Sequence, residues 1–173
     1  MNRLADLDTW VFQWVAQYTS SSTQPISIYF RWVSKTGDGQ LYILLAAILF
    51  YFDEQHGALF LYTALTAYCF EIPMYLILKH GFKRKRPCDL FLNVEAYVIP
   101  ADKFSLPSGH TAAAFLMATI IMHFYPNLAL VAYLWACMVG LSRIVLRVHF
   151  PLDVLLGASL GIAVALCSIY FFG

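Results

Sequence analysis

Three short polar clusters hold the groups that can do chemistry in this chain of 173 residues. The first is basic and covers residues 79–87, the second is Pro107-Ser108-Gly109-His110, and the third covers residues 142–153. Basic side chains attract anions, and arginine adds a forked set of N–H donors that matches phosphate oxygens. The clusters therefore predict a phosphate site. Its expected ligands are Lys79, Arg86, Ser108, Gly109 and Arg143.

Two histidines supply the groups that can break a phosphate ester. His149, oriented by Asp153 through one ring nitrogen, presents its other nitrogen to phosphorus as a nucleophile. His110 stands at the start of a helix, where free N–H groups and the helix dipole attract an anion, and it protonates the departing oxygen. This scheme needs no metal and no other cofactor. The chain also lacks the carboxylate cluster that a magnesium-dependent phosphatase requires.

Each cluster also has an ordinary structural interpretation. Lys79 and Arg86 stand where an apolar run ends, and basic residues there often contact lipid headgroups. Ser108 is typical of a helix N-cap, and Asp153, soon after Pro151, is typical of the first turn of a helix. The three clusters together favour catalysis, because histidines, basic residues and a carboxylate then gather on one membrane face.

The composition predicts a membrane protein. Hydrophobic residues make up 61% of the chain and charged residues 12%, against about half and about a quarter in soluble domains. A soluble bundle of this size has too little interior for so many apolar residues. The net charge of +1 gives no field for nucleic acid, so we expect no nucleic-acid partner. The first residues lack the pattern of a cleaved signal peptide.

Apolar runs divide the chain into helices that must position the clusters. Three are near the length needed to cross a hydrocarbon layer of about 30 Å, and two shorter ones span by tilt or bilayer thinning. The runs are residues 57–78, 128–148 and 152–172, and the shorter 39–52 and 110–125.

The remaining segments complete a single unit. Residues 4–18 predict an amphipathic helix that either lies in the membrane interface or packs as a sixth bundle helix, and residues 26–33 predict another short helix. The long polar segment 79–109 and the turn around His149 are two crossings apart, so both lie on the same membrane face. Because no linker or repeat interrupts the chain, we expect one domain over residues 1–173.

The clusters resemble the signature motifs of a known family, the type 2 phosphatidic acid phosphatase superfamily. The matching spacings are Lys79-x6-Arg86-Pro87, Pro107-Ser108-Gly109-His110 and Ser142-Arg143-x5-His149-x3-Asp153. The resemblance implies an all-α, multi-pass transmembrane bundle of five to six helices that acts as a metal-independent phosphatase through a phosphohistidine. It implies the roles given above for the histidines, Asp153 and the phosphate ligands. The family's soluble haloperoxidases share this site, but the apolar composition argues against that branch.

The resemblance also implies a substrate, a lipid whose phosphate lies in the headgroup layer. It favours hydrolysis of undecaprenyl pyrophosphate to undecaprenyl phosphate, because small bacterial members recycle that carrier. Phosphatidylglycerophosphate and phosphatidic acid stay open as substrates, and so does transfer of the phosphoryl group to another lipid. A non-catalytic membrane protein that binds anions or lipids is the remote alternative. We expect no obligate protein partner.

Membrane orientation is the one point on which two arguments conflict. The opposite turn carries Asp53 and Glu54, whereas the site face holds five basic residues outside the motifs, so the positive-inside rule puts the site in the cytoplasm. These five are Lys83, Arg84, Lys85, Lys103 and Arg147. The resemblance implies a bacterial inner-membrane protein with a periplasmic site. We follow the resemblance, because basic residues at a phosphate site have a functional reason to be there.

Overall fold

Every secondary-structure element in the part that the structure describes is a helix, in a computed structural model covering residues 3–20, 25–92, 94–100 and 102–172. The elements, in chain order, are α1 Arg3–Ser20, α2 Pro25–Lys35, α3 Gln40–Phe52, α4 Gly57–Phe82, α5 Pro87–Leu90, α6 Gly109–Phe124, the 3-10 helix η1 Pro126–Leu128, α7 Ala129–Val145 and α8 Pro151–Phe172. This confirms the all-α prediction.

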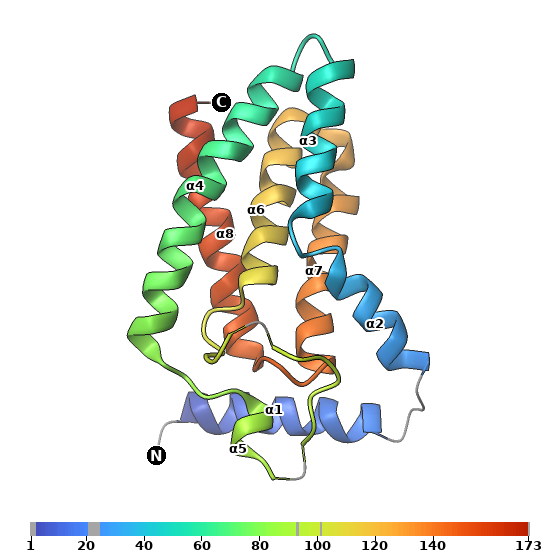
Figure 1. The fold of residues 1–173 in the computed structure, drawn as a ribbon, viewed down its shortest axis with the longest axis vertical. Helices are drawn as coiled ribbons and strands as arrows, with labels where there is room; N and C mark the ends of the chain where they lie inside the picture. Colours follow the sequence, from blue (N-terminus) through green and yellow to red (C-terminus); the bar gives the residue numbers. More distant parts are fainter. Residues whose placement is uncertain (1–2, 21–24, 93, 101, 173) are drawn as a thin grey trace.

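Helices α3, α4, α6, α7 and α8 stand upright side by side and form the bundle (Figure 1). The stretches Gly57–Leu90, Pro126–Val145 and Pro151–Phe172 are long and apolar enough to cross a membrane, while α3 and α6 are shorter apolar helices. Their outward faces carry many exposed large hydrophobic side chains, such as Ile43, Ile77 and Leu155. Exposed apolar bands of this size fit lipid, so the chain is an integral membrane protein.

Close packing of α6 against α8 sets the frame of the candidate site. The two helices meet at Gly157 and Gly161, one turn apart on α8. A Cβ atom at Gly157 would lie 2.5 Å from the Ser108 carbonyl oxygen, and one at Gly161 would lie 2.1 Å from that of Ala112. Glycine at this spacing lets two membrane helices approach at backbone distance. The start of α6 is thereby fixed beside the start of α8.

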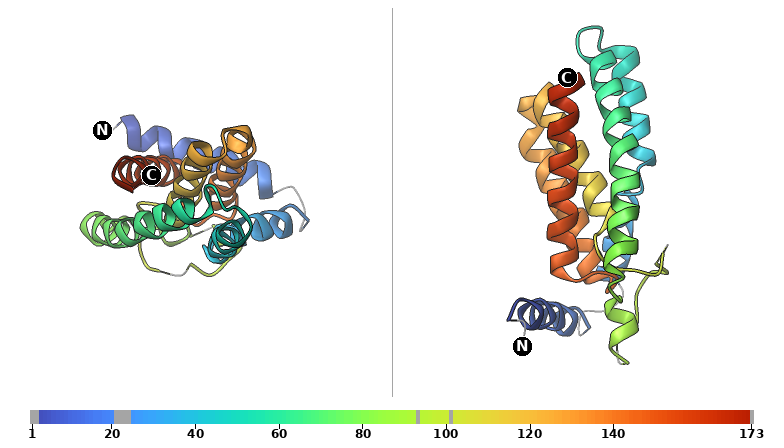
Figure 2. Two further views of the ribbon diagram at one scale, coloured as in Figure 1. Left: turned by 90° about the horizontal axis from the view of Figure 1, so that it is seen from above. Right: turned by 90° about the vertical axis from the view of Figure 1, so that its left-hand side faces the viewer.

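Helix α1 lies across the lower end of the bundle rather than alongside it (Figures 1 and 2). Its residues Asp8, Phe12 and Ala16 are buried against the bundle. The predicted apolar stripe, which includes Leu7 and Trp14, is instead exposed. Because an apolar stripe left uncovered at the end of a membrane bundle suits the lipid interface, the structure favours the interfacial alternative over a sixth upright helix.

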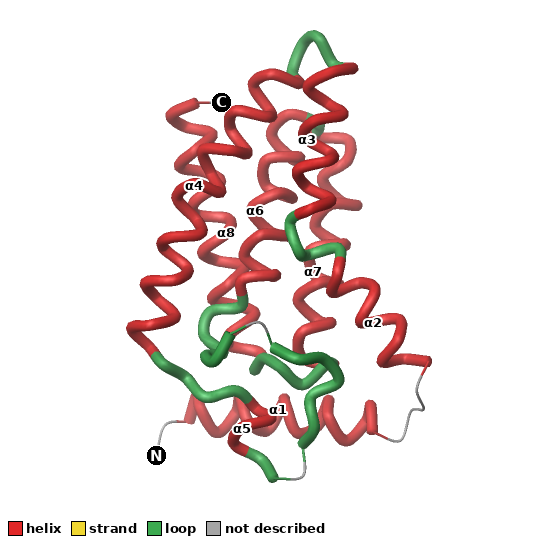
Figure 3. The backbone as a smooth tube through the Cα atoms, in the orientation of Figure 1, coloured by secondary structure: helices red, strands yellow, loops and turns green. Residues whose placement is uncertain are grey.

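The long polar segment and the turn before α8 meet at this same lower end (Figure 3). The Tyr97 N–H donates to the Leu146 carbonyl at 3.2 Å, and the Ser105 N–H donates to the Arg84 carbonyl at 2.8 Å. The segment therefore folds back over the ends of α7 and α8. Both polar segments thus lie at the same end of the bundle, as the prediction of one shared membrane face requires.

Candidate active site

The predicted site residues all come to the lower end of the bundle, from five parts of the chain. Lys79 lies near the end of α4, Arg86 just before α5, Ser108, Gly109 and His110 at the start of α6, Arg143 near the end of α7, and His149 and Asp153 around the start of α8.

His149 is buried in the turn between α7 and α8, with its Nε2 atom toward the cations. Arg86 Nη1 donates to this nitrogen at 3.3 Å, and donates to the Val148 carbonyl at 2.7 Å. Burial lowers the pKa of His149 well below its ordinary value, and the positive charges of Arg143, Arg86 and Lys79 act in the same direction. The ring is therefore neutral at physiological pH, with Nε2 unprotonated.

Asp153 is close to His149 but is mainly held by other groups. Its Oδ2 atom lies 3.6 Å from His149 Nδ1, beyond hydrogen-bond reach, and that nitrogen has no hydrogen-bond partner. The carboxylate accepts the Phe150 N–H at 2.8 Å and Arg84 Nη1 at 2.8 Å. Asp153 thus caps the start of α8, as its ordinary structural interpretation held. A small shift of its carboxylate would bring it within hydrogen-bond distance of His149 Nδ1 and so orient the imidazole.

Asp102 holds the two cations of the first cluster together. Its carboxylate accepts hydrogen bonds from Lys79 Nζ at 2.6 Å, from Arg86 Nη2 at 2.6 Å and from the Tyr75 hydroxyl at 2.7 Å. Burial alone would raise the pKa of Asp102, but these hydrogen bonds hold it below its usual range. The Asp102 side chain is 34% exposed, against 3% for each cation, so the carboxylate is the accessible partner. It uses donors that a phosphate would need.

We expect Asp102→Asn to strengthen inhibition by orthovanadate about three- to tenfold, because removing the carboxylate charge frees the two cations for an anion. The measurement is the vanadate inhibition constant of the purified protein. Glu95→Gln is the matched control, since Glu95 is an exposed carboxylate of the same segment. Weaker inhibition in Asp102→Asn would contradict this interpretation and make Asp102 a support that the cations need for binding.

The start of α6 offers backbone donors next to these cations. The first backbone hydrogen bond of this turn runs from the Ala112 N–H to the Ser108 carbonyl at 3.0 Å, so the N–H groups of Gly109 and His110 precede it. The Ser108 side chain makes no capping hydrogen bond and instead pairs with the Thr111 hydroxyl at 2.9 Å. The N-cap interpretation is therefore wrong for the Ser108 side chain.

His110 and Arg143 line a cavity together with residues of α2. His110 Nε2 lies 2.7 Å from Asp38 Oδ1, in the loop between α2 and α3. Arg143 Nη1 donates to the Ser34 hydroxyl, while its buried Nε has no partner in the described structure. An unsatisfied buried donor on a guanidinium is what an anion site presents before its anion is bound.

Sequence reasoning missed four acidic or basic residues that support this site. Asp38 pairs with His110, and Asp102 bridges two phosphate ligands. Arg84 joins Asp153 to Asp8 of α1, which also accepts the Leu152 N–H at 2.8 Å. A count of membrane crossings would have put Asp38 on the same face as the site. Nothing in the sequence spacing pairs Asp8 with Arg84, which lies far away in the chain.

The fold and the motifs define a membrane family, and the comparisons identify it. The model of the PAP2 superfamily matches residues 56–173. The chain belongs to the PAP2 superfamily, as its resemblance predicted, and it is an all-helical membrane member. Among the described residues no group of three His, Cys, Asp or Glu side chains is placed to hold a metal ion.

Individual relatives agree with this assignment. The chain is 39% identical over 90 residues to a lipid A 1-phosphatase of Porphyromonas gingivalis, covering 50% of this chain and 18% of the relative. It is 36% identical over 97 residues to phosphatidylglycerophosphatase B of Bacillus subtilis, covering 50% and 45%. The chain thus spans less than half the length of these two proteins. The crystal structure of Aquifex aeolicus LpxE has a TM-score of 0.82 and 29% identity, covering 95% of both chains.

Proposed function

We propose that this protein hydrolyses the phosphate group of a membrane lipid through a covalent phosphohistidine at His149. One observation carries the proposal: His149 Nε2 lies 3.3 Å from Arg86 Nη1 and accepts its hydrogen bond, among buried cations. A neutral imidazole with its lone pair toward bound phosphate is an activated nucleophile. The names of the two phosphatase relatives support a lipid substrate.

The proposed reaction has two balanced steps. His149 Nε2 attacks phosphorus, an N–P bond forms, and the bond to the leaving oxygen breaks as His110 gives that oxygen a proton. Water then loses a proton to His110 and attacks the phosphohistidine, which releases inorganic phosphate and restores His149. Lys79, Arg86, Arg143 and the backbone donors at the start of α6 stabilise charge on the phosphate oxygens.

The test is phosphate release by the purified protein in detergent micelles. The panel contains phosphatidylglycerophosphate, phosphatidic acid, lipid A and undecaprenyl pyrophosphate. We expect release from at least one lipid, persisting in EDTA because the proposed site uses no metal, and inhibited by vanadate. No release from any of these lipids, or loss of activity in EDTA, would contradict the proposal.

The preferred substrate within the panel remains undecaprenyl pyrophosphate, with phosphatidylglycerophosphate and phosphatidic acid as alternatives. The names of the relatives add lipid A to the substrates worth assaying. Transfer to a second lipid uses the same phosphohistidine, and it would appear as radiolabel in the acceptor lipid rather than in inorganic phosphate. We further propose that residues 1–173 act as one domain without an obligate protein partner or metal.

We propose a bacterial inner membrane with the site on the periplasmic face. Two of the basic residues behind the opposing argument have partners within the fold. Arg84 binds Asp8 and Asp153, and Arg147 donates to the Ala16 carbonyl at 3.2 Å. Structural roles for these arginines weaken the use of their charge as a topology signal.

We expect Cys88, half-buried in α5, to react with a membrane-impermeant charged maleimide in intact cells. The other cysteines, Cys69, Cys137 and Cys167, lie on the apolar helices α4, α7 and α8, where such a reagent does not reach. Cys88→Ser is the control and should abolish labelling. Labelling that requires permeabilised cells would place the site in the cytoplasm.

A further inference from the structure

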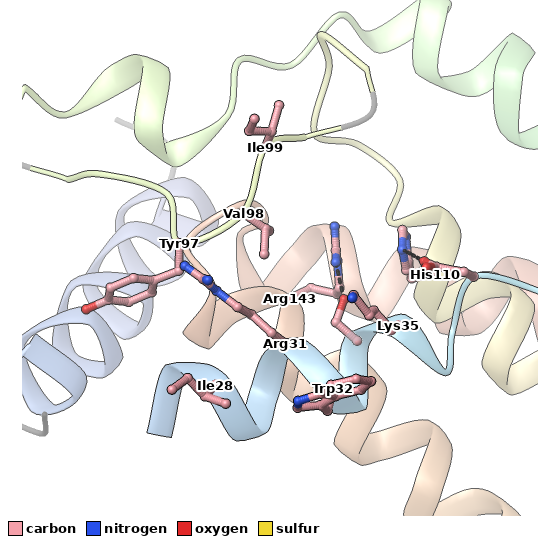
Figure 4. Close-up of a pocket in the computed structure, with 11 residues that line it drawn as sticks. Ile28, Arg31, Trp32, Lys35, Tyr97, Val98, Ile99, His110 and Arg143 are labelled. Carbon is pink, nitrogen blue, oxygen red and sulfur yellow. Dashed lines mark hydrogen bonds and ion pairs between the residues drawn. The ribbon is translucent and has the colours of Figure 1, made fainter. Parts of the chain in front are cut away.

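A cavity of about 670 Å³ opens beside the candidate active site, between α2 and residues 97–99 (Figure 4). His110 and Arg143 belong to its lining, so the cavity is continuous with the proposed phosphate site. His149 does not line it. The cavity therefore borders the proposed general acid but not the proposed nucleophile.

This position identifies which part of a substrate would enter the cavity. In phosphoryl transfer the attacking and leaving atoms lie roughly in line on opposite sides of phosphorus. With His149 as nucleophile and His110 protonating the departing oxygen, the leaving group extends past His110. The space available to it there is this cavity, whose far wall is α2.

The α2 wall carries two cations that have no acidic partner among the residues described. Arg31 extends from α2 toward Tyr97, and Lys35 packs its ammonium 4.9 Å from the centre of the Trp32 ring (Figure 4). The one carboxylate of the lining, Asp38, is already paired with His110. The cavity thus presents net positive charge beyond that of the phosphate site.

Apolar side chains complete the lining. Ile28 and Ile99 stand at the cavity with 50% and 97% of their surface exposed, and Val98 lies between Ile99 and Tyr97. A leaving group that fits this surface carries an anion near the scissile bond and continues into a hydrocarbon chain. Surface cations without this apolar lining would attract the anion but would not select for the hydrocarbon chain attached to it.

We propose that this cavity is a subsite for a second phosphate, carried by the leaving group of the lipid and recognised by Arg31 and Lys35. The inference rests on the proposed function and narrows its substrate class. Preferred substrates are lipid pyrophosphates and lipids with a phosphodiester or second phosphomonoester in the leaving group. A lipid whose leaving group is an uncharged alcohol, such as phosphatidic acid, leaves the subsite empty.

The test compares substrates that share a tail and differ in the second phosphate. Phosphatidylglycerophosphate is paired with phosphatidic acid of the same acyl chains, and undecaprenyl pyrophosphate with undecaprenyl phosphate. In the double variant Arg31→Gln with Lys35→Gln we expect KM for the two-phosphate lipids to rise about tenfold or more, because two charge-assisted contacts are lost. KM for phosphatidic acid stays within about twofold of wild type, since it makes neither contact. The two arms distinguish a pyrophosphate from a phosphodiester as the preferred source of the second phosphate.

Controls separate this subsite from general attraction to an anionic surface. Lys103→Gln removes an exposed lysine on the same face that does not line the cavity, and it should leave both KM values unchanged. Arg31→Lys keeps the positive charge and should therefore retain part of the preference for two-phosphate lipids that the double variant loses. An equal rise in KM for phosphatidic acid, or no rise for any two-phosphate lipid, would overturn the subsite while the hydrolase proposal stands. Failure of the wild-type protein to hydrolyse any panel lipid would overturn the proposed function itself.

Discussion

His149→Ala should lower kcat for every hydrolysed lipid by about four orders of magnitude or more, because it removes the nucleophile on which the covalent step depends. The buried cations remain, so vanadate and lipid should still bind, although vanadate loses its imidazole partner. The measurement is phosphate release under saturating lipid, with thermal unfolding of the same preparation to show that the bundle is folded.

His80→Ala is the matched control for this loss. His80 is an exposed histidine near the end of α4, and its Nδ1 lies 2.8 Å from the Leu76 carbonyl oxygen rather than near the site. It should retain wild-type kcat. Substantial turnover by His149→Ala would show that phosphorus is attacked by another group, or directly by water, and would favour a binding role for the third cluster.

His110→Ala should cost activity in proportion to the demands of the leaving group. General acid catalysis contributes about a hundredfold to ten-thousandfold when the departing oxygen is a poor leaving group. We therefore expect a loss of that size with phosphatidic acid and a much smaller loss in the first step with p-nitrophenyl phosphate, whose leaving group needs no proton. The readouts are steady-state kcat/KM values for the two substrates.

Asp38→Asn supplies a second check on the same assignment. Because Asp38 Oδ1 lies 2.7 Å from His110 Nε2, this contact holds the imidazole ring in position. The variant should show the same ordering of substrates with a smaller loss. Equal losses on both substrates in His110→Ala would contradict proton transfer to the leaving group and assign His110 to phosphate binding.

The helices were largely predictable because their apolar runs respond to a single requirement, the thickness of the bilayer. The run predicted at residues 57–78 is α4, which continues to Phe82 and so carries Lys79 within its last turn. Spacing alone does not show that extension, because Lys79 reads as the end of an apolar run. Its burial becomes favourable only through Asp102 and Tyr75, which contact its ammonium.

The residues of the candidate site were identified by ordered spacing, whereas their partners were not. Asp38 and Asp102 are carboxylates in polar segments and Asp8 belongs to the predicted amphipathic helix, and in the sequence each resembles any solvent-exposed acid. Their importance arises from long-range contacts with His110, with the two cations and with Arg84. Such contacts depend on how α1, α2 and the long segment fold over the bundle, which hydrophobic periodicity does not determine.

The most direct test is to locate the phosphoryl group on the protein during turnover. A lipid labelled at its terminal phosphate is mixed with the purified protein, the reaction is quenched in alkali, where phosphohistidine survives, and the labelled peptide is sequenced. We predict label on His149. In His110→Ala, a labelled substrate with an activated leaving group should still form the phosphohistidine, and more label should accumulate because the base that activates water for its hydrolysis is missing. Label on another side chain, or turnover with no labelled peptide, would contradict the account.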